Sequence, residues 1–107
     1  SIPALKQHGP AMQHQTLANI YTTAMAVKAD VFSMALTEQI YLDESGVIQL
    51  VPKIGNHIIV LGDTSAMKEK LEKLRIFYRQ GMKNEAWKNY GVVNLRFRDQ
   101  IVCTKTS

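Results

Sequence analysis

The sequence predicts an α+β domain, with two helices packed on a mostly antiparallel sheet, and three observations support this fold class. Apolar residues recur with a helical period in two segments, near residues 16–28 and 65–81. Elsewhere the period changes to two, in short segments separated by turn residues. The resulting element order, α, β, β, β, α, β, β, is typical of helices on one antiparallel sheet. At 107 residues the chain has the usual length of one domain, so we expect a single domain over residues 1–107.

The first helix is predicted over residues 16–28, with Thr16 as an acceptable N-cap. Its apolar positions recur at helical spacing and are Leu17, Ile20, Tyr21, Ala24 and Val27. Residues 1–15 include two prolines and a glycine and show no clean period, so we expect an irregular lead-in there. We expect residues 30–34 to close the helix.

Three strands are predicted next, over residues 36–42, 47–51 and 57–61. Turn residues at positions 43–46 separate the first two strands. Pro52 ends the second strand because proline removes a donor from the ladder. Strands in such close succession form a meander. The second strand is apolar at both alternating sets of positions, so we expect both of its faces to be covered.

The second helix is predicted to begin soon after Gly62. Its cap is Asp63, Thr64 or Ser65, and the sequence leaves this choice open. Gly81 can end the helix. One apolar stripe runs along it and consists of Met67, Leu71, Leu74, Phe77 and Tyr78.

The chain is predicted to end in a hairpin, after a connecting loop over residues 84–90. Its strands are residues 92–97 and 100–105, with Arg98 and Asp99 near the turn. Such a hairpin leaves one row of amides and carbonyls unpaired unless another segment covers it. An exposed edge can accept a strand from a partner. The alternative is that charged side chains and the short length of the strand only block aggregation.

Composition excludes several classes of protein. Hydrophobic residues make up 46% of the chain and charged residues 21%, which is ordinary for a globular domain. The longest uncharged run, residues 11–27, is too polar to span a bilayer. Residues 1–15 lack the pattern of a secretory signal, and the start Ser1-Ile2-Pro3 leads us to expect an internal cut from a longer protein. One cysteine excludes an internal disulfide.

The residue types that serve in catalysis or metal binding occur in the sequence, but their spacing does not fit a catalytic or metal site. His8, His14 and His57 lack the spacing of metal ligands. Cys103 falls in a predicted strand, where a buried and inert thiol is the usual outcome. The carboxylates do not form pairs suited to acid–base work. We therefore expect no enzyme activity, no metal, no cofactor and no small-molecule substrate.

The basic charge leaves a second class of function open. The formal net charge is +4 and the sequence pI is near 9.3. A nucleic-acid or anionic-surface binder would use Lys68, Lys70, Lys73, Arg79, Arg96 and Arg98. The alternative is that the basic residues of the second helix form a solvated face paired with Glu69 and Glu72. Few aromatic residues accompany these cations, so we expect no nucleic-acid partner.

Residues 50–62, which begin Leu50-Val51-Pro52-Lys53-Ile54-Gly55-Asn56-His57, fit the pattern L-V-P-R/K-h-G-N-H-x-I-x-h-G, where h is hydrophobic. This pattern resembles a segment of the FtsQ/DivIB family of bacterial cell-division proteins. Further stretches agree in order and spacing. They are residues 70–74 with Phe77-Tyr78 (a Lys/Leu-rich helix), Trp87 with Tyr90 (W-x-x-Y), and Val93-Asn94-Leu95-Arg96-Phe97 followed by Gln100-Ile101-Val102-Cys103 (the final strands). The match covers about residues 40–105.

The resemblance implies the extracytoplasmic β domain of a membrane-anchored protein, on the periplasmic side, with one membrane helix and a POTRA domain upstream. It implies a non-catalytic divisome scaffold for septation that binds FtsB/DivIC-like and FtsL-like partners. In the family a partner segment adds as a strand to the end of the domain. By motif, that surface comprises Val92, Val93, Asn94, Leu95, Arg96, Phe97, Gln100, Ile101, Val102, Cys103 and Thr104.

The inward register of this hairpin stays open, because Val92 and Val93 are both apolar. Either Val93, Leu95 and Phe97 pack inward or the alternate positions do. A proline at Val102 or Ile101 is expected to weaken partner binding more than folding, because it removes a backbone donor from the docking edge.

Overall fold

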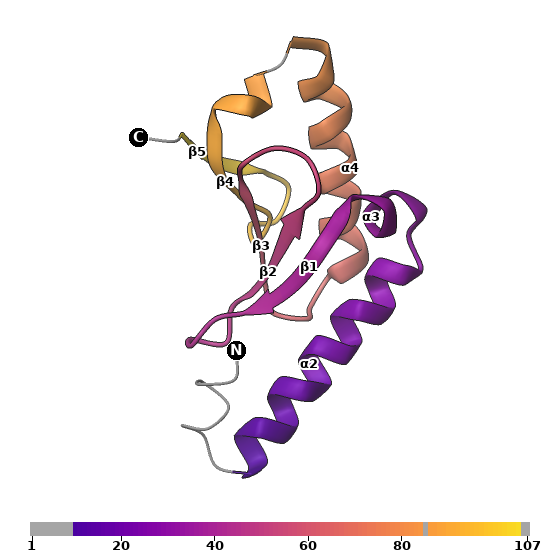
Figure 1. Cartoon of the computed structure of the whole chain (residues 1–107), viewed down its shortest axis with the longest axis vertical. Coiled ribbons are helices and arrows are strands. Elements are labelled where there is room, and N and C mark those ends of the chain that lie inside the picture. The colour runs from indigo at the N-terminus through magenta and orange to yellow at the C-terminus, as the bar shows by residue number, and fades with distance from the viewer. Residues whose placement is uncertain (1–9, 85, 106–107) are drawn as a thin grey trace.

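The computed structural model describes residues 10–84 and 86–105 as a five-stranded sheet with helices packed against it (Figure 1). The helices are α2 (Pro10–Lys28), α3 (Val31–Leu36) and α4 (Met67–Asn84), with a 3-10 turn, η1 (Ala86–Asn89). The strands are β1 (Thr37–Leu42), β2 (Ile48–Pro52), β3 (Ile58–Gly62), β4 (Tyr90–Asn94) and β5 (Val102–Lys105). The predicted α+β class is confirmed.

The strands lie in the order β1-β2-β3-β4-β5. The first three form the predicted antiparallel meander. β3 and β4 are parallel, because the crossover through α4 brings the chain back in the same direction. β5 then pairs antiparallel with β4 and completes the predicted hairpin. The two edges of the sheet are therefore β1 and β5.

The core lies between one face of the sheet and α4. Ile48, Leu50 and Ile59 of the sheet are buried, as are Leu74 and Tyr78 of the helix. The expectation that both faces of the second strand are covered is wrong, because its alternate positions are only half-buried. That one-sided burial is typical of an antiparallel strand with helices on a single face.

The helical segments before the sheet differ from the predictions. α2 begins at Pro10, six residues before the predicted cap, since proline is well suited to the first turn of a helix. Residues 1–9 of the predicted lead-in lie outside the described residues. Residues 30–34 were expected only to end the first helix, but a second helix, α3, begins there. The side chain of Asp30 caps α3 by accepting from the Ser33 amide at 2.9 Å. The pattern Asp-x-x-Ser was the signal for this cap.

α4 also extends beyond its predicted end. Gly81 keeps a helical backbone and is buried, and the helix continues to Asn84. Positive φ values occur instead at Gly46, Gly55 and Gly62, where the chain turns. The predicted loop over residues 84–90 contains η1, and the side chain of Trp87 lies outside the described part.

Candidate functional site at the sheet edge

Strand β5 forms one edge of the sheet, beside the C-terminal end of the chain (Figure 1). Val93 lies opposite Cys103 and Asn94 lies opposite Val102 in the ladder with β4. Among residues 10–84 and 86–105, no strand pairs with the other side of β5. An edge of this kind presents backbone donors and acceptors to an added strand. The opposite edge differs, because α2 packs against β1.

The structure settles the register that the sequence left open. Val93 is fully buried, and Cys103 beside it packs against the same core. Val102 and Thr104 occupy the alternate positions and are exposed. Burial raises the pKa of the Cys103 thiol, which keeps it protonated at neutral pH.

The two strands of the hairpin are shorter than predicted. β4 covers residues 90–94 rather than 92–97, and the Asn94 side chain closes a turn that follows it. Its Oδ1 accepts from the backbone N–H of Arg96 at 3.0 Å and from the guanidinium Nε at 3.1 Å. Leu95 stays buried, but Phe97 leaves the inward pattern and is 42% exposed. β5 begins at Val102 rather than at residue 100.

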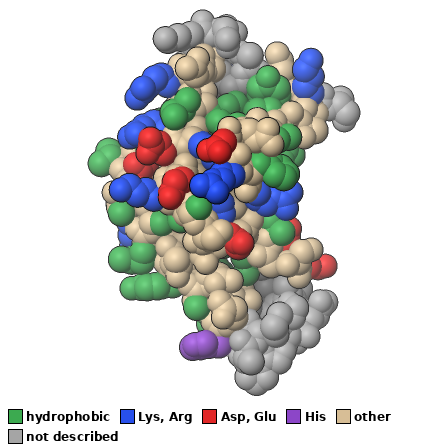
Figure 2. Space-filling model, turned by 180° about the vertical axis from the view of Figure 1, so that it is seen from behind, with side chains coloured by type: hydrophobic (Ala, Val, Ile, Leu, Met, Phe, Trp, Pro, Cys, Tyr) green, Lys and Arg blue, Asp and Glu red, His purple; other side chains and the backbone are tan. Residues whose placement is uncertain are grey.

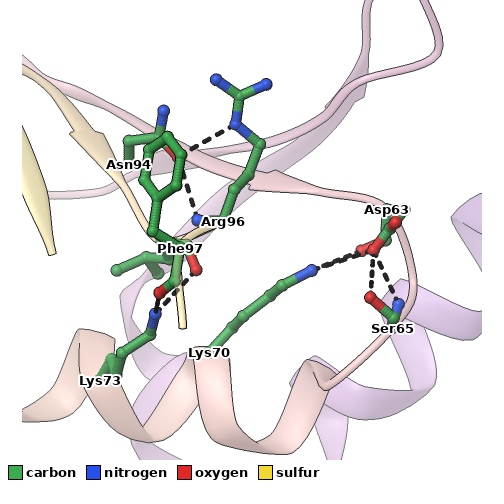
Figure 3. A network of polar contacts seen from close by, with 8 residues as sticks. Asp63, Ser65, Lys70, Lys73, Asn94, Arg96 and Phe97 are labelled. Carbon is green, nitrogen blue, oxygen red and sulfur yellow. Dashed lines mark hydrogen bonds and ion pairs between the residues drawn. The ribbon is translucent and has the colours of Figure 1, made fainter. Parts of the chain in front are cut away.

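Lys73 of α4 holds the connection between β4 and β5 in place (Figure 3). Its Nζ donates to the backbone oxygen of Leu95 at 2.9 Å and to that of Gln100 at 3.1 Å, and also to that of Phe97. Burial is the main cause that lowers the pKa of Lys73, and the nearby Lys70 ammonium adds to it. One ammonium thus fixes three carbonyls of the segment that precedes β5.

Lys70, one helical turn before, stabilises the start of α4 (Figure 3). Its buried Nζ contacts Asp63 Oδ1 at 3.2 Å and donates to the Asp63 backbone oxygen at 3.1 Å. The same carboxylate accepts from the amide and hydroxyl of Ser65. Ser65 and then Lys70 lower the pKa of Asp63 to about 2. Asp63 therefore holds the turn before the helix, which begins at Met67.

Arg96 packs over Gly62 at the end of β3. A Cβ built on Gly62 would lie 2.7 Å from Arg96 Cγ, so only glycine leaves room for this arginine. The guanidinium carbon of Arg96 lies 5.8 Å from the ring centroid of Phe97. Arginine and phenylalanine thus lie together over the end of β3, at the point where the connection leaves the sheet.

A groove of about 920 Å³ separates the N-terminal half of α4 from this connection. Its apolar lining includes Ile76, Leu95, Phe97 and Ile101. The charged lining comprises Glu69, Lys70, Lys73, Arg96, Arg98 and Asp99. Because Ile101 lines the groove and immediately precedes β5, the groove and the open edge are adjacent.

A buried polar pair lies beneath the sheet, where α4 meets the start of β3. His57 Nε2 and the Tyr78 hydroxyl are hydrogen-bonded, and both residues are almost fully buried. Burial lowers the pKa of His57 and raises that of Tyr78. Both side chains are therefore neutral near pH 7, and their hydrogen bond satisfies polar atoms inside the core. In the part of the chain that the structure describes, no group of three His, Cys, Asp or Glu side chains could hold a metal ion.

The six cations of the alternative function do not form one free basic face. Lys70 is buried against Asp63, and Lys73 is bound to backbone oxygens. The expectation that the basic residues of the second helix form a solvated face is therefore wrong for these two. Spacing along the helix gave no signal for this role, since their partners lie 7 to 27 residues away in the sequence. Lys68, Arg79 and Arg98 are exposed.

A family model described as FtsQ/DivIB, C-terminal related, matches residues 6–104. The chain belongs to this family. The resemblance noted in the sequence is thereby confirmed, and membership implies a role in bacterial cell division. Comparisons with curated proteins and with solved structures gave no match.

FtsQ/DivIB proteins are non-catalytic scaffolds of division, and the family indicates a periplasmic domain of a membrane-anchored protein. Over residues 10–84 and 86–105 of this FtsQ/DivIB-related chain, no helix combines the length and the apolar character needed to cross a membrane.

Proposed function

We propose that this FtsQ/DivIB-related domain is a non-catalytic divisome scaffold that binds an FtsB/DivIC-like partner, acting with an FtsL-like subunit, during septum formation. The partner adds an extended segment as a strand along β5. The observation that carries this proposal is the position of β5 at an edge of the sheet, with β4 on one side only.

The side chains of β5 provide selectivity for such a strand. Main-chain hydrogen bonds supply affinity in strand addition, and alternate side chains supply specificity. Val102 and Thr104 are exposed, whereas Cys103 faces the core. On the exposed face of the sheet, side chains of an added strand would therefore lie beside Val102 and Thr104, and on the other face beside the partly buried Cys103.

The connection before β5 supports the same role. Lys73 fixes the backbone of this connection through three carbonyls, so the connection itself loses little conformational entropy when a partner binds. Arg96 and Phe97 belong to this connection and are exposed, and arginine and aromatic residues are common among the side chains that dominate binding energy. The adjacent groove gives the partner's side chains a place to pack once the strand passes Ile101.

Proline substitution in β5 tests strand addition. Successive amides of a strand point to opposite edges, so Val102→Pro and Cys103→Pro remove donors on opposite sides of β5. We expect one variant to keep its melting temperature and lose at least tenfold in affinity for an FtsB/DivIC-like partner, and the other to lose stability. Gln39→Pro in β1 is the control at the opposite edge, where partner affinity should not change.

Calorimetric titration gives the affinities, and thermal melts give the stabilities. If every β5 variant that folds binds the partner with the affinity of the parent domain, the proposal of strand addition at this edge is wrong. A titration of the domain with nucleic acid between about 50 and 200 mM salt addresses the alternative function, because six to ten phosphate contacts would weaken that binding by roughly 10³ to 10⁵. Binding of the FtsB/DivIC-like partner through main-chain contacts should change far less over the same range.

A further inference from the structure

The solvent-facing side of α2 carries an apolar stripe, although surface helices normally turn polar residues outward, as this helix does at Gln15 and Thr22. Leu17, Tyr21 and Met25 are 57%, 67% and 49% exposed. They are four residues apart, so they follow one another along one face of the helix. Thr23 and Val27, on the opposite face, are buried against the rest of the domain. The apolar stripe is therefore additional to the face that packs on the core.

α2 also lacks charge. No Asp, Glu, Lys or Arg occurs from Ala11 to Val27, and Lys28 is its last residue. Figure 2 shows this contrast: the charged side chains gather over α4, while hydrophobic side chains follow the lower part of the same face, over α2. The stripe from Leu17 to Met25 is therefore uncharged, and the first charge in line with it is Lys28, which is exposed at the end of the helix.

The next helix, α3, adds two exposed apolar residues, Val31 at 87% and Met34 at 54%. Together with the stripe, these partly exposed residues offer on the order of 300–600 Å² of apolar area, the size of the largest patch on a typical monomer. That is less than the roughly 800 Å² that each partner contributes to a standard stable interface, so the association expected is a weak one.

We propose that this surface pairs with the same surface of a second copy, so that α2 lies against α2 across a two-fold axis. A two-fold interface places each patch against itself and therefore requires a self-complementary surface. An uncharged apolar stripe meets that requirement, whereas the basic remainder of a chain with net charge +4 does not. A membrane surface is the poorer fit, because helices that lie on membranes carry Lys and Arg beside the apolar face.

The position of the stripe makes this pairing compatible with the open edge. α2 packs against β1, and β5 is at the other edge of the five-stranded sheet. A dimer formed through α2 thus leaves both copies of β5 accessible. The proposal does not depend on strand addition and can be tested without any other protein.

Charge substitution in the stripe tests the dimer. Sedimentation velocity of the 107-residue chain over a concentration series should show a monomer–dimer equilibrium. Tyr21→Lys is expected to raise the dimer dissociation constant at least tenfold, with an unchanged melting temperature because the side chain is largely exposed. The matched control is Ile54→Lys, the same kind of change at an exposed residue of the connection between β2 and β3, which should dimerise as the parent does.

Cysteine cross-linking locates the axis. In a Cys103→Ser background, single cysteines at Leu17, Tyr21 and Met25 should form disulfide-linked dimers under mild oxidation, with the highest yield nearest the axis. A cysteine at Ile54 should give much less. A chain that stays monomeric throughout, that binds anionic lipid vesicles only as a monomer, or that dimerises equally well as Tyr21→Lys would overturn the proposal.

Discussion

Replacing Lys73 by methionine tests whether the connection before β5 is held from α4. Methionine keeps most of the aliphatic stem but removes the three hydrogen bonds to Leu95, Phe97 and Gln100. A hydrogen bond to a charged group contributes about 1.5–3 kcal/mol, and two of these three are solvent-exposed. We therefore expect Lys73→Met to cost about 2 kcal/mol of folding free energy, or roughly 10 °C in melting temperature.

Thermal melts and amide hydrogen exchange measure this effect. Exchange should accelerate mainly over residues 96–102, because the core beneath is unchanged. Lys68→Met is the control, since that lysine is on the same helix and exposed. A Lys73→Met variant with parental stability and unchanged exchange over this segment would refute the reasoning. The position of the Lys73 ammonium beside these carbonyls would then be only one of several conformations of equal energy that a surface side chain adopts.

Two further predictions concern the support of the site. Gly62→Ala and Gly46→Ala both place alanine at a φ of +86°, but only the alanine at position 62 would meet Arg96. Gly62→Ala should therefore lower the melting temperature more than Gly46→Ala does. Equal losses of melting temperature would contradict the contact with Arg96. The buried His57–Tyr78 pair should confine maximal stability to pH values between about 6.5 and 10. Since the pKa of His57 is lowered, stability falls as the pH drops below the unfolded-state value of 6.5; since that of Tyr78 is raised, stability falls as the pH rises above 10. Melts from pH 4 to 11 check this, and Tyr78→Phe should reduce the alkaline decline, to which the buried Cys103 thiol also contributes because its pKa is raised. An undiminished decline in that variant would contradict the role of Tyr78.

The sequence predicted the fold class, the meander and the final hairpin, because periods of two and of 3.6 are local properties of the chain. It misplaced ends that depend on single contacts. The Asn94 side chain closes the turn that follows β4, and Gly81 stays helical where its backbone is buried. The parallel pairing of β3 with β4 likewise depends on the crossover through α4 and has no local signal.

The candidate site was predictable in position but not in its supports. A final strand at the end of the chain suggested an open edge, and motif resemblance put the partner surface there. The roles of Lys70 and Lys73 were hidden, because a lysine bound to backbone oxygens has the same spacing in the sequence as one in solvent. Such long-range contacts are decided by how α4 packs on the sheet.

The two surfaces proposed here have a joint consequence, because they lie on opposite sides of the sheet. A dimer joined through α2 would present two β5 edges at once. If the partner is itself dimeric, as a coiled-coil subunit would be, the second strand would bind at a high effective concentration and raise the affinity without any new contact. Tyr21→Lys should then weaken binding of a dimeric partner more than that of an isolated partner strand. Equal effects on the two would show that the surfaces act independently.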